Sequence, residues 1–249
     1  MRIQLPAFVA AAALAACTAT PKPSTEPSPQ TSAYRPSPNI RWYRASAERR
    51  AIYVEVYRAA AERLEQRVKP LAPQSWAVIL DADETVLDNS PNEEESDSLH
   101  QPFSDARFVA WVKRDAARAL PGAADFTRHV HDLGGKVAIV TNRADSLCDH
   151  TRRTLTRAGI TADEVLCQPN GASSDKNPRF QAVAQGTPPS TLPKLTVVMW
   201  LGDNIQDFPA PTGAQSIRSA PDSAFAPFGD IYFVLPNPMY GSWEHNPLP

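Results

Sequence analysis

The sequence predicts an α/β fold in which helices cover both faces of a doubly wound parallel sheet. Several short runs are apolar throughout, among them SWAVILD (75–81), KVAIVTN (136–142) and LTVVMWLGD (195–203). Helical patterns separate these runs, and strands without polar alternation belong to sheets that are buried on both faces. The runs also end abruptly in acidic and other polar residues, which is typical of strands that lead into a ligand site.

The first predicted element is a long helix over 46–69. Apolar residues recur there with a four-residue rhythm, and charged residues lie between them. Ser46 is suited to cap the start of this helix, and Pro70 is suited to end it.

The remaining elements follow in alternation. After the strand at 75–81, the acidic run Glu93-Glu94-Glu95 is typical of a solvated loop. If this run overhangs a binding site, it would disfavour ligands with several negative charges. Helices are predicted at about 104–116, 121–133 and 144–158, and a short one from Pro178. The other predicted strands are 136–142, 164–167, 195–203 and 231–235.

Composition excludes several classes of protein. The 249 residues carry a net charge of −2, which argues against a nucleic-acid polymer as a partner because no basic excess faces the phosphates. Hydrophobic residues make up 42%, enough for a globular core. Three Cys are too few for a scaffold built on disulfides.

The N-terminus has the pattern of an export signal. Residues 1–17 hold one Arg and then an apolar run too short to span a bilayer as a mature helix. The run ends in Leu14-Ala15-Ala16-Cys17, which resembles the lipobox of bacterial lipoproteins and implies a lipid anchor on Cys17. Thr18 then implies the outer membrane of the bacterial cell envelope, with the domain in or facing the periplasm. An ordinary cleaved signal with an incidental Cys17 is the alternative.

Residues 18–38 contain six Pro and eight Ser or Thr, which predicts an extended tether. We expect residues 39–249 to form the folded domain, since this length suits one domain and shows no internal repeat.

Polar residues that follow the apolar runs are the candidate site. They are Asp81-Ala82-Asp83-Glu84-Thr85, Thr141-Asn142-Arg143, Asp175-Lys176-Asn177 and Gly202-Asp203-Asn204-Ile205-Gln206-Asp207. The carboxyl ends of parallel strands meet at one edge of a sheet, so we expect these groups to lie together. Carboxylates, a hydroxyl and an ammonium suit a hard cation such as Mg²⁺ beside a phosphate.

Each of these motifs also has a structural explanation. The acidic stretch at 81–85 could be a surface turn or the start of a calcium loop, but Val86 and Asn92 stand where that loop needs Gly and Glu. Thr141 could be only a strand former, and Lys176 only a solvated charge. Zinc is excluded because no Cys or His cluster has ligand spacing; we expect packing or surface roles for His129 and His131.

These motifs resemble those of the haloacid dehalogenase superfamily, and specifically its class C acid phosphatases, the bacterial outer-membrane lipoprotein acid phosphatase and 5′-nucleotidase branch. The similarity extends over most of 39–249. It is carried by ILDADETVLDNSP (79–91), QPFSDARFVAWV (101–112), RALPGAADF (118–126), VTNR (140–143), DKNPRF (175–180), LGDNIQDF (201–208) and VLPNPMYGSWE (234–244). It implies a Rossmann-like core with a small helical cap and an N-terminal helix.

The resemblance implies a role for each site residue. Asp81 would be the nucleophile that forms an aspartyl-phosphate, and Asp83 would protonate the leaving oxygen and then activate water. Thr141, Asn142 and Lys176 would bind the phosphate. The metal ligands would be Asp81, the backbone carbonyl of Asp83, Asp203 and Asp207, and Mg²⁺ is the expected ion. The expected substrates are 5′-nucleotides and aromatic or small phosphomonoesters.

Substrate binding is less determined by these motifs. Tyr240 and Trp243 could stack on an aromatic leaving group, but aromatic residues near a C-terminus are also often simply packed. Asn92 stands where the family pattern has an aromatic residue, which puts one wall of an aromatic clamp in doubt.

Three alternatives stay open. A disulfide between Cys148 and Cys167 is permitted in an exported protein, but the sequence does not place them within bridging distance. The chain ends soon after Trp243, which we expect to weaken a homodimer contact of the family, so the oligomeric state is open. The alternative function is a binding or storage lipoprotein of the same fold without turnover.

Overall fold

The computed structural model describes residues 34–209 and 218–248. The chain divides into two units, Met1–Tyr34 and Arg35–Pro249. The predicted signal peptide (1–17), its Cys17 and residues 18–33 of the predicted tether lie outside the described residues. Within them, no helix combines the length and the apolar character needed to cross a membrane.

In the described residues, five parallel strands form one sheet in the order β5-β4-β1-β6-β7. Their bounds are β1 Trp76–Leu80, β4 Lys136–Ala144, β5 Glu164–Gln168, β6 Thr196–Gly202 and β7 Tyr232–Val234. The order reverses between β1 and β6, because the chain first moves outward to β5 and then returns to the other side of β1. The predicted parallel sheet is confirmed, and each predicted strand agrees with an observed one to within two residues at either end.

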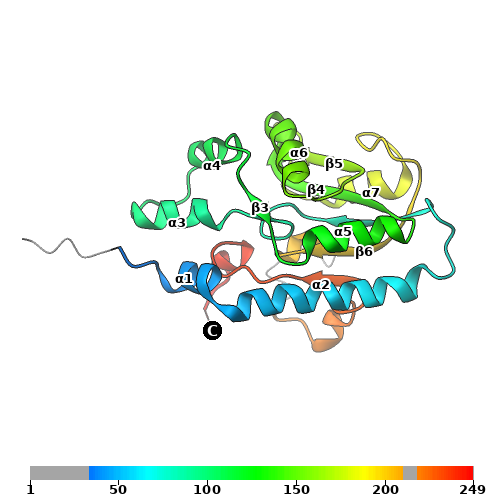
Figure 1. Ribbon diagram of the computed structural model, residues 1–249, viewed down its shortest axis with the longest axis horizontal. Helices are drawn as coiled ribbons and strands as arrows, with labels where there is room; N and C mark the ends of the chain where they lie inside the picture. The colour runs from blue at the N-terminus through cyan, green and yellow to red at the C-terminus, as the bar shows by residue number, and fades with distance from the viewer. Residues whose placement is uncertain (1–33, 210–217, 249) are drawn as a thin grey trace, which may run out of the picture. The chain divides into compact units, whose positions relative to one another are not determined.

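Helices cover both faces of this sheet (Figure 1). Val78 and Leu80 of β1 pack in one core with residues of α2 (Ala47–Val68), α5 (Ala123–Asp132) and α6 (Cys148–Arg157). Ala77 and Ile79 pack in a second core with α7 (Asn177–Gln185). Neighbouring residues of a strand point to opposite faces, so these two cores show the doubly wound arrangement directly.

The helix predicted from Ser46 is α2, and Ser46 caps it as expected: its Oγ accepts a hydrogen bond from the N–H of Arg49 at 3.1 Å. A short helix, α1 (Pro38–Ala45), precedes it and was not predicted. The helix predicted over 144–158 begins at Cys148, because β4 continues to Ala144 and the turn η1 (Asp145–Leu147) follows.

A small cap of helices lies beyond the main sheet (Figure 1). It consists of α3 (Ser90–Ser98) and α4 (Asp105–Val112), joined to the core by the antiparallel pair β2 (Leu87–Asp88) and β3 (Arg118–Ala119). The prediction of a solvated loop at Glu93–Glu95 is wrong, since these residues belong to α3. Pro91 and Glu93 in its first turn both favour a helix start, a signal that its lack of apolar periodicity obscured.

The remaining described elements are short. They are the 3₁₀ helices η2 (Ile205–Asp207), η3 (Asp222–Phe225) and η4 (Ser242–His245). Of these, η2 directly follows β6 and carries a candidate site residue, Asp207.

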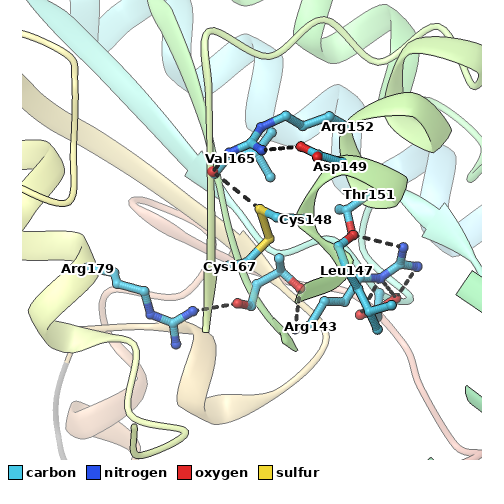
Figure 2. The surroundings of a disulfide bond; sticks show 11 residues. Arg143, Leu147, Cys148, Asp149, Thr151, Arg152, Val165, Cys167 and Arg179 are labelled. Carbon is cyan, nitrogen blue, oxygen red and sulfur yellow. Dashed lines mark hydrogen bonds and ion pairs between the residues drawn. A yellow bond between two sulfur atoms is a disulfide. The ribbon is translucent and has the colours of Figure 1, made fainter. Parts of the chain in front are cut away.

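Cys148 and Cys167 form a disulfide, which settles the pairing left open by the sequence. Cys148 is the first residue of α6, Cys167 lies in β5, and their Cα atoms are 5.9 Å apart. Figure 2 shows the bond beside Leu147 and Thr151, close to the end of β4. The bond therefore fastens the start of α6 to the edge of the sheet next to the polar end of β4.

Replacing both cysteines, Cys148→Ser with Cys167→Ser, is expected to lower the free energy of unfolding by about 3 kcal/mol. The bond joins residues with a sequence separation of 19. Without this cross-link the unfolded chain has more conformational entropy, which stabilises the unfolded state. Urea denaturation measures the change. Reductant is expected to destabilise the wild type by a similar amount and to leave the double variant unaffected; a wild type indifferent to reductant would contradict the bond.

Candidate active site

The predicted site residues meet at the carboxyl edge of three adjacent strands. Leu80, the last residue of β1, lies opposite Ile139 of β4 and Leu201 of β6. Asp81, Thr141 and Asp203 therefore leave the same edge of the sheet. This edge is also the point where the strand order reverses, which is where doubly wound sheets bind their ligands.

A buried ammonium joins two of the acids. Lys176 lies at the start of α7, and its Nζ donates to Oδ1 of Asp81 and, at 2.6 Å, to Oδ1 of Asp207. Burial alone would lower the pKa of Lys176, but the adjacent carboxylates of Asp207 and Asp81 raise it instead. Lys176 therefore stays protonated and acts as a fixed positive charge between two acids.

The carboxylates crowd one another. Burial raises the pKa of Asp81 to about 7; Lys176 opposes this rise, while Asp207 and Asp83 add to it. Burial also raises the pKa of Asp203 well above its usual range, and Asp207 and Asp81 add to that rise. The single ammonium of Lys176 does not neutralise the three carboxylates of Asp81, Asp203 and Asp207. The site therefore favours the binding of a further cation.

Asp81, Asp203 and Asp207 form a candidate metal centre, the single such group in the described part of the chain. Each offers a carboxylate oxygen, and these oxygens lie within 4.8 Å of one another. Gly202 permits the approach, because a Cβ there would lie 2.2 Å from Cβ of Asp207. A set made only of carboxylate oxygens fits a hard divalent cation such as Mg²⁺.

The flanking segments hold these acids in place. Asp207 closes a capping box, its Oδ2 accepting from the N–H of Asn204 at 2.9 Å. Asp203 accepts from Nδ2 of Asn237 at 2.9 Å and from Oγ1 of Thr85 at 3.3 Å. The C-terminal segment that carries Asn237 therefore contributes to the site.

The predicted phosphate-binding turn lies beside Asp81. Thr141 is fully buried, and its Oγ1 accepts a hydrogen bond from the N–H of Arg143 at 3.2 Å. Asn142 donates to the carbonyl of Ser174 at 2.9 Å. Arg179 of α7 binds the carbonyl of Thr141 and the side chain of Asn142, which ties this turn to the helix that carries Lys176.

Asp83 faces a different environment from the other acids. Its side chain pairs with Arg143 and accepts a hydrogen bond from Asn89, and it is absent from the candidate metal group. No role for Arg143, Asn89 or Arg179 was predicted from the sequence. Arg143 offered one signal, a charged residue placed directly after the predicted phosphate-binding pair.

Asp83 also lines a cavity of about 490 Å³ between the cap and the C-terminal segment. Phe103 and Phe108 form one side, with ring centroids 6.0 Å apart, and Tyr240 lies on the wall with them. Glu93 and Glu244 add two carboxylates to the lining. The cavity is large enough for an aromatic group beside Asp83.

The structure separates the two aromatic residues predicted to stack. Tyr240 lines the cavity and its hydroxyl donates to the buried carboxylate of Glu84. Trp243 lies outside the lining of this cavity. It lines another groove with Trp42 and Pro238, and its indole N–H donates to the carbonyls of Asn237 and Tyr240.

Asn92 does not remove the aromatic wall of the cavity. It is buried and donates to Oε1 of Glu93 at 2.9 Å, and Phe103 and Phe108 supply the rings from farther along the chain. Neither Phe was predicted as a site residue, although both lie in the segment QPFSDARFVAWV.

Comparison with known proteins agrees with this geometry. Residues 12–243 match the family described as HAD superfamily, subfamily IIIB (acid phosphatase). The structure is similar to the class C acid phosphatase from Bacillus anthracis with tungstate bound, with a TM-score of 0.74 and 29% identity over 83% of this chain and 85% of that chain. A second structure of that enzyme gives 0.73 with the same identity and coverage. The chain is a phosphomonoester hydrolase that belongs to the subfamily IIIB acid phosphatases of the HAD superfamily.

Proposed function

We propose that this protein is a Mg²⁺-dependent acid phosphatase that hydrolyses 5′-nucleotides and aromatic or small phosphomonoesters through an aspartyl-phosphate. The observation that carries the proposal is the pairing of Asp81 with Lys176 at the point where Asp203 and Asp207 converge. A carboxylate can attack a phosphate only where cations offset the repulsion between them. The tungstate in the Bacillus anthracis structure is an oxyanion, which is consistent with a phosphate site in this fold.

Asp81, Asp203 and Asp207 would hold the Mg²⁺, and we expect the backbone carbonyl of Asp83 to join them. When bound, the ion neutralises charge on the carboxylates and on the phosphate. Lys176 supplies the other positive charge from within the protein, and we expect the Thr141 hydroxyl and the Asn142 amide to bind phosphate oxygens.

Asp81 and Asp83 act together in the two steps of the reaction, which are transfer of the phosphoryl group to Asp81 and its hydrolysis. Asp81 attacks phosphorus, the bond from phosphorus to the leaving oxygen breaks, and Asp83 gives that oxygen a proton. In the second step Asp83 takes a proton from water, the water oxygen bonds to phosphorus, and the bond to Asp81 breaks. Asp83 suits this role because it follows the nucleophile by two residues and lines the cavity for the leaving group.

The leaving group is expected to contact Phe103, Phe108 and Tyr240. These rings offer a stacking surface for a nucleobase or a phenol without selecting one by hydrogen bonds. The carboxylates of Glu93 and Glu244 give the same cavity a negative charge, which disfavours esters that carry a second anionic group.

We also propose that the protein is anchored in the cell envelope. The lipobox-like Leu14-Ala15-Ala16-Cys17 supports an anchor on Cys17, and the Pro-rich residues 18–38 support a tether to the folded domain. Thr18 supports the outer membrane of the bacterial cell envelope. Labelling of Cys17 by a radioactive fatty acid, lost in Cys17→Ala, tests the anchor.

The soluble form, residues 18–249, is expected to release phosphate only with Mg²⁺ when it is assayed at pH about 5–7. We expect p-nitrophenyl phosphate, AMP and nicotinamide mononucleotide to react faster than glucose 6-phosphate, because only the first three offer an aromatic ring to the cavity. Asp81→Asn is expected to fold and to lose activity. Substantial activity in Asp81→Asn would contradict the nucleophile, and equal rates on glucose 6-phosphate would contradict the stacking surface.

Removing the cavity's acids, in Glu93→Gln with Glu244→Gln, is expected to improve turnover of 4-carboxyphenyl phosphate relative to its uncharged methyl ester. The gain in the kcat/KM ratio should be on the order of threefold for each acid, because charges several ångströms apart in water interact by less than about 1 kcal/mol. Added salt should reduce this gain in the kcat/KM ratio, because it screens the charges.

Glu95→Gln is the matched control for these variants. Glu95 lies on the same helix and pairs with Arg114 at 3.1 Å outside the cavity lining. A shift as large in Glu95→Gln, or none in the double variant, would show that Glu93 and Glu244 do not set this preference.

A further inference from the structure

The carboxylate of Asp83 is held from one side by a buried guanidinium. Arg143 donates from Nε to Oδ1 and Oδ2 of Asp83, at 2.9 and 3.2 Å, and from Nη2 to Oδ1 at 2.7 Å. The Arg143 side chain is 1% exposed, whereas that of Asp83 is 18% exposed and lines the cavity. A pairing of this kind fixes orientation as well as charge, because the guanidinium is planar and its donors are rigid.

Asn89 donates a further hydrogen bond to Oδ1 of Asp83. Its Nδ2 donates to Oδ1 of Asp83 at 2.6 Å. Its own Oδ1 accepts from Nε1 of Trp111 at 2.8 Å, and its N–H donates to Glu84 at 2.7 Å. Asn89 is fully buried, so the direction of its amide is fixed by partners on several sides.

Arg143 is fixed in turn by elements outside the site. Its Nη1 reaches Oγ1 of Thr151 on α6 at 3.5 Å, a contact drawn in Figure 2, and its Cζ lies 5.8 Å from the centre of the Phe108 ring. The guanidinium thus spans the end of β4, α6 and the cap helix α4. Its position is set by the fold and not by Asp83 alone.

These contacts treat the two oxygens of Asp83 differently. Oδ1 accepts from three donors, which are Nε and Nη2 of Arg143 and Nδ2 of Asn89. Oδ2 accepts from a single donor at 3.2 Å, the Nε that Oδ1 also uses. Oδ1 has no lone pair to spare, so Oδ2 is the oxygen that can carry a proton.

We propose that Arg143 and Asn89 are positioning residues that occupy Oδ1 of Asp83 and leave Oδ2 to transfer the proton to the leaving oxygen. This inference rests on the proposed role of Asp83 as the general acid. As Asp81 bonds to phosphorus and the leaving oxygen departs, the proton passes from Oδ2 to that oxygen. Asp83 is left as a carboxylate, and the hydrogen bonds from Arg143 stabilise its charge.

Leaving-group dependence tests this role. Benzyl phosphate releases a strongly basic alkoxide that needs a proton, whereas p-nitrophenyl phosphate releases a stable phenolate, and both offer one ring to the cavity. In Arg143→Met we expect kcat/KM for benzyl phosphate to fall at least about tenfold more than for p-nitrophenyl phosphate, since general acids contribute about 10²–10⁴-fold. Arg143→Lys, which keeps the charge but not the planar pairing, should show a smaller selective loss.

Turnover of p-nitrophenyl phosphate by the two Arg143 variants shows that these proteins are folded. Asn89→Ser should repeat the selective loss. Arg153→Met, which removes an exposed arginine of α6 that pairs with Asp115, should change neither rate. Asp83→Asn should show the selective loss in full, and adding Arg143→Met to it should not increase that loss.

The positioning role of Arg143 would be overturned if Arg143→Met and Arg143→Lys lost activity equally on both esters while Asp83→Asn still showed the selective loss. The role of Asp83 as the acid would then stand. No selective loss in Asp83→Asn would overturn the role of Asp83 as the acid and this inference with it.

Discussion

The structure depends on one buried positive charge among several buried acids. The ammonium of Lys176 contacts both Asp81 and Asp207, and these three side chains are almost completely buried. Removing one partner from a buried ion pair leaves the other uncompensated and costs about 3–5 kcal/mol. The site can therefore form only when the segments that carry these residues are all in place.

The fold supplies those segments by its strand order. β1 lies between β4 and β6, so its carboxyl end has a neighbour on each side. Lys176 reaches Asp81 from α7, which packs on the face opposite to α2 and α5. Each crossover of the doubly wound sheet therefore delivers one component of the site to a single point.

The strands and the polar residues at their ends could be predicted from the sequence, because they follow from the pattern of apolar residues. The apolar runs located the strands because burial on both faces leaves no polar alternation, and the polar residues that end them located Asp81, Thr141 and Asp203. Contacts made by side chains from distant segments could not be predicted in this way. Three features depend on the folded geometry in this way: the pairing of Asp83 with Arg143, the Cys148–Cys167 bond and the position of Trp243 outside the cavity.

Direct detection of the aspartyl-phosphate tests whether Asp81 is the nucleophile that bonds to phosphorus. In Asp83→Asn the second step lacks its base, so the intermediate should accumulate. After rapid acid quenching of this variant with p-nitrophenyl phosphate and Mg²⁺, peptide mass spectrometry is expected to find one phosphoryl group on Asp81. A phosphoryl group on another residue, or none while phenolate is released in a burst, would contradict the account.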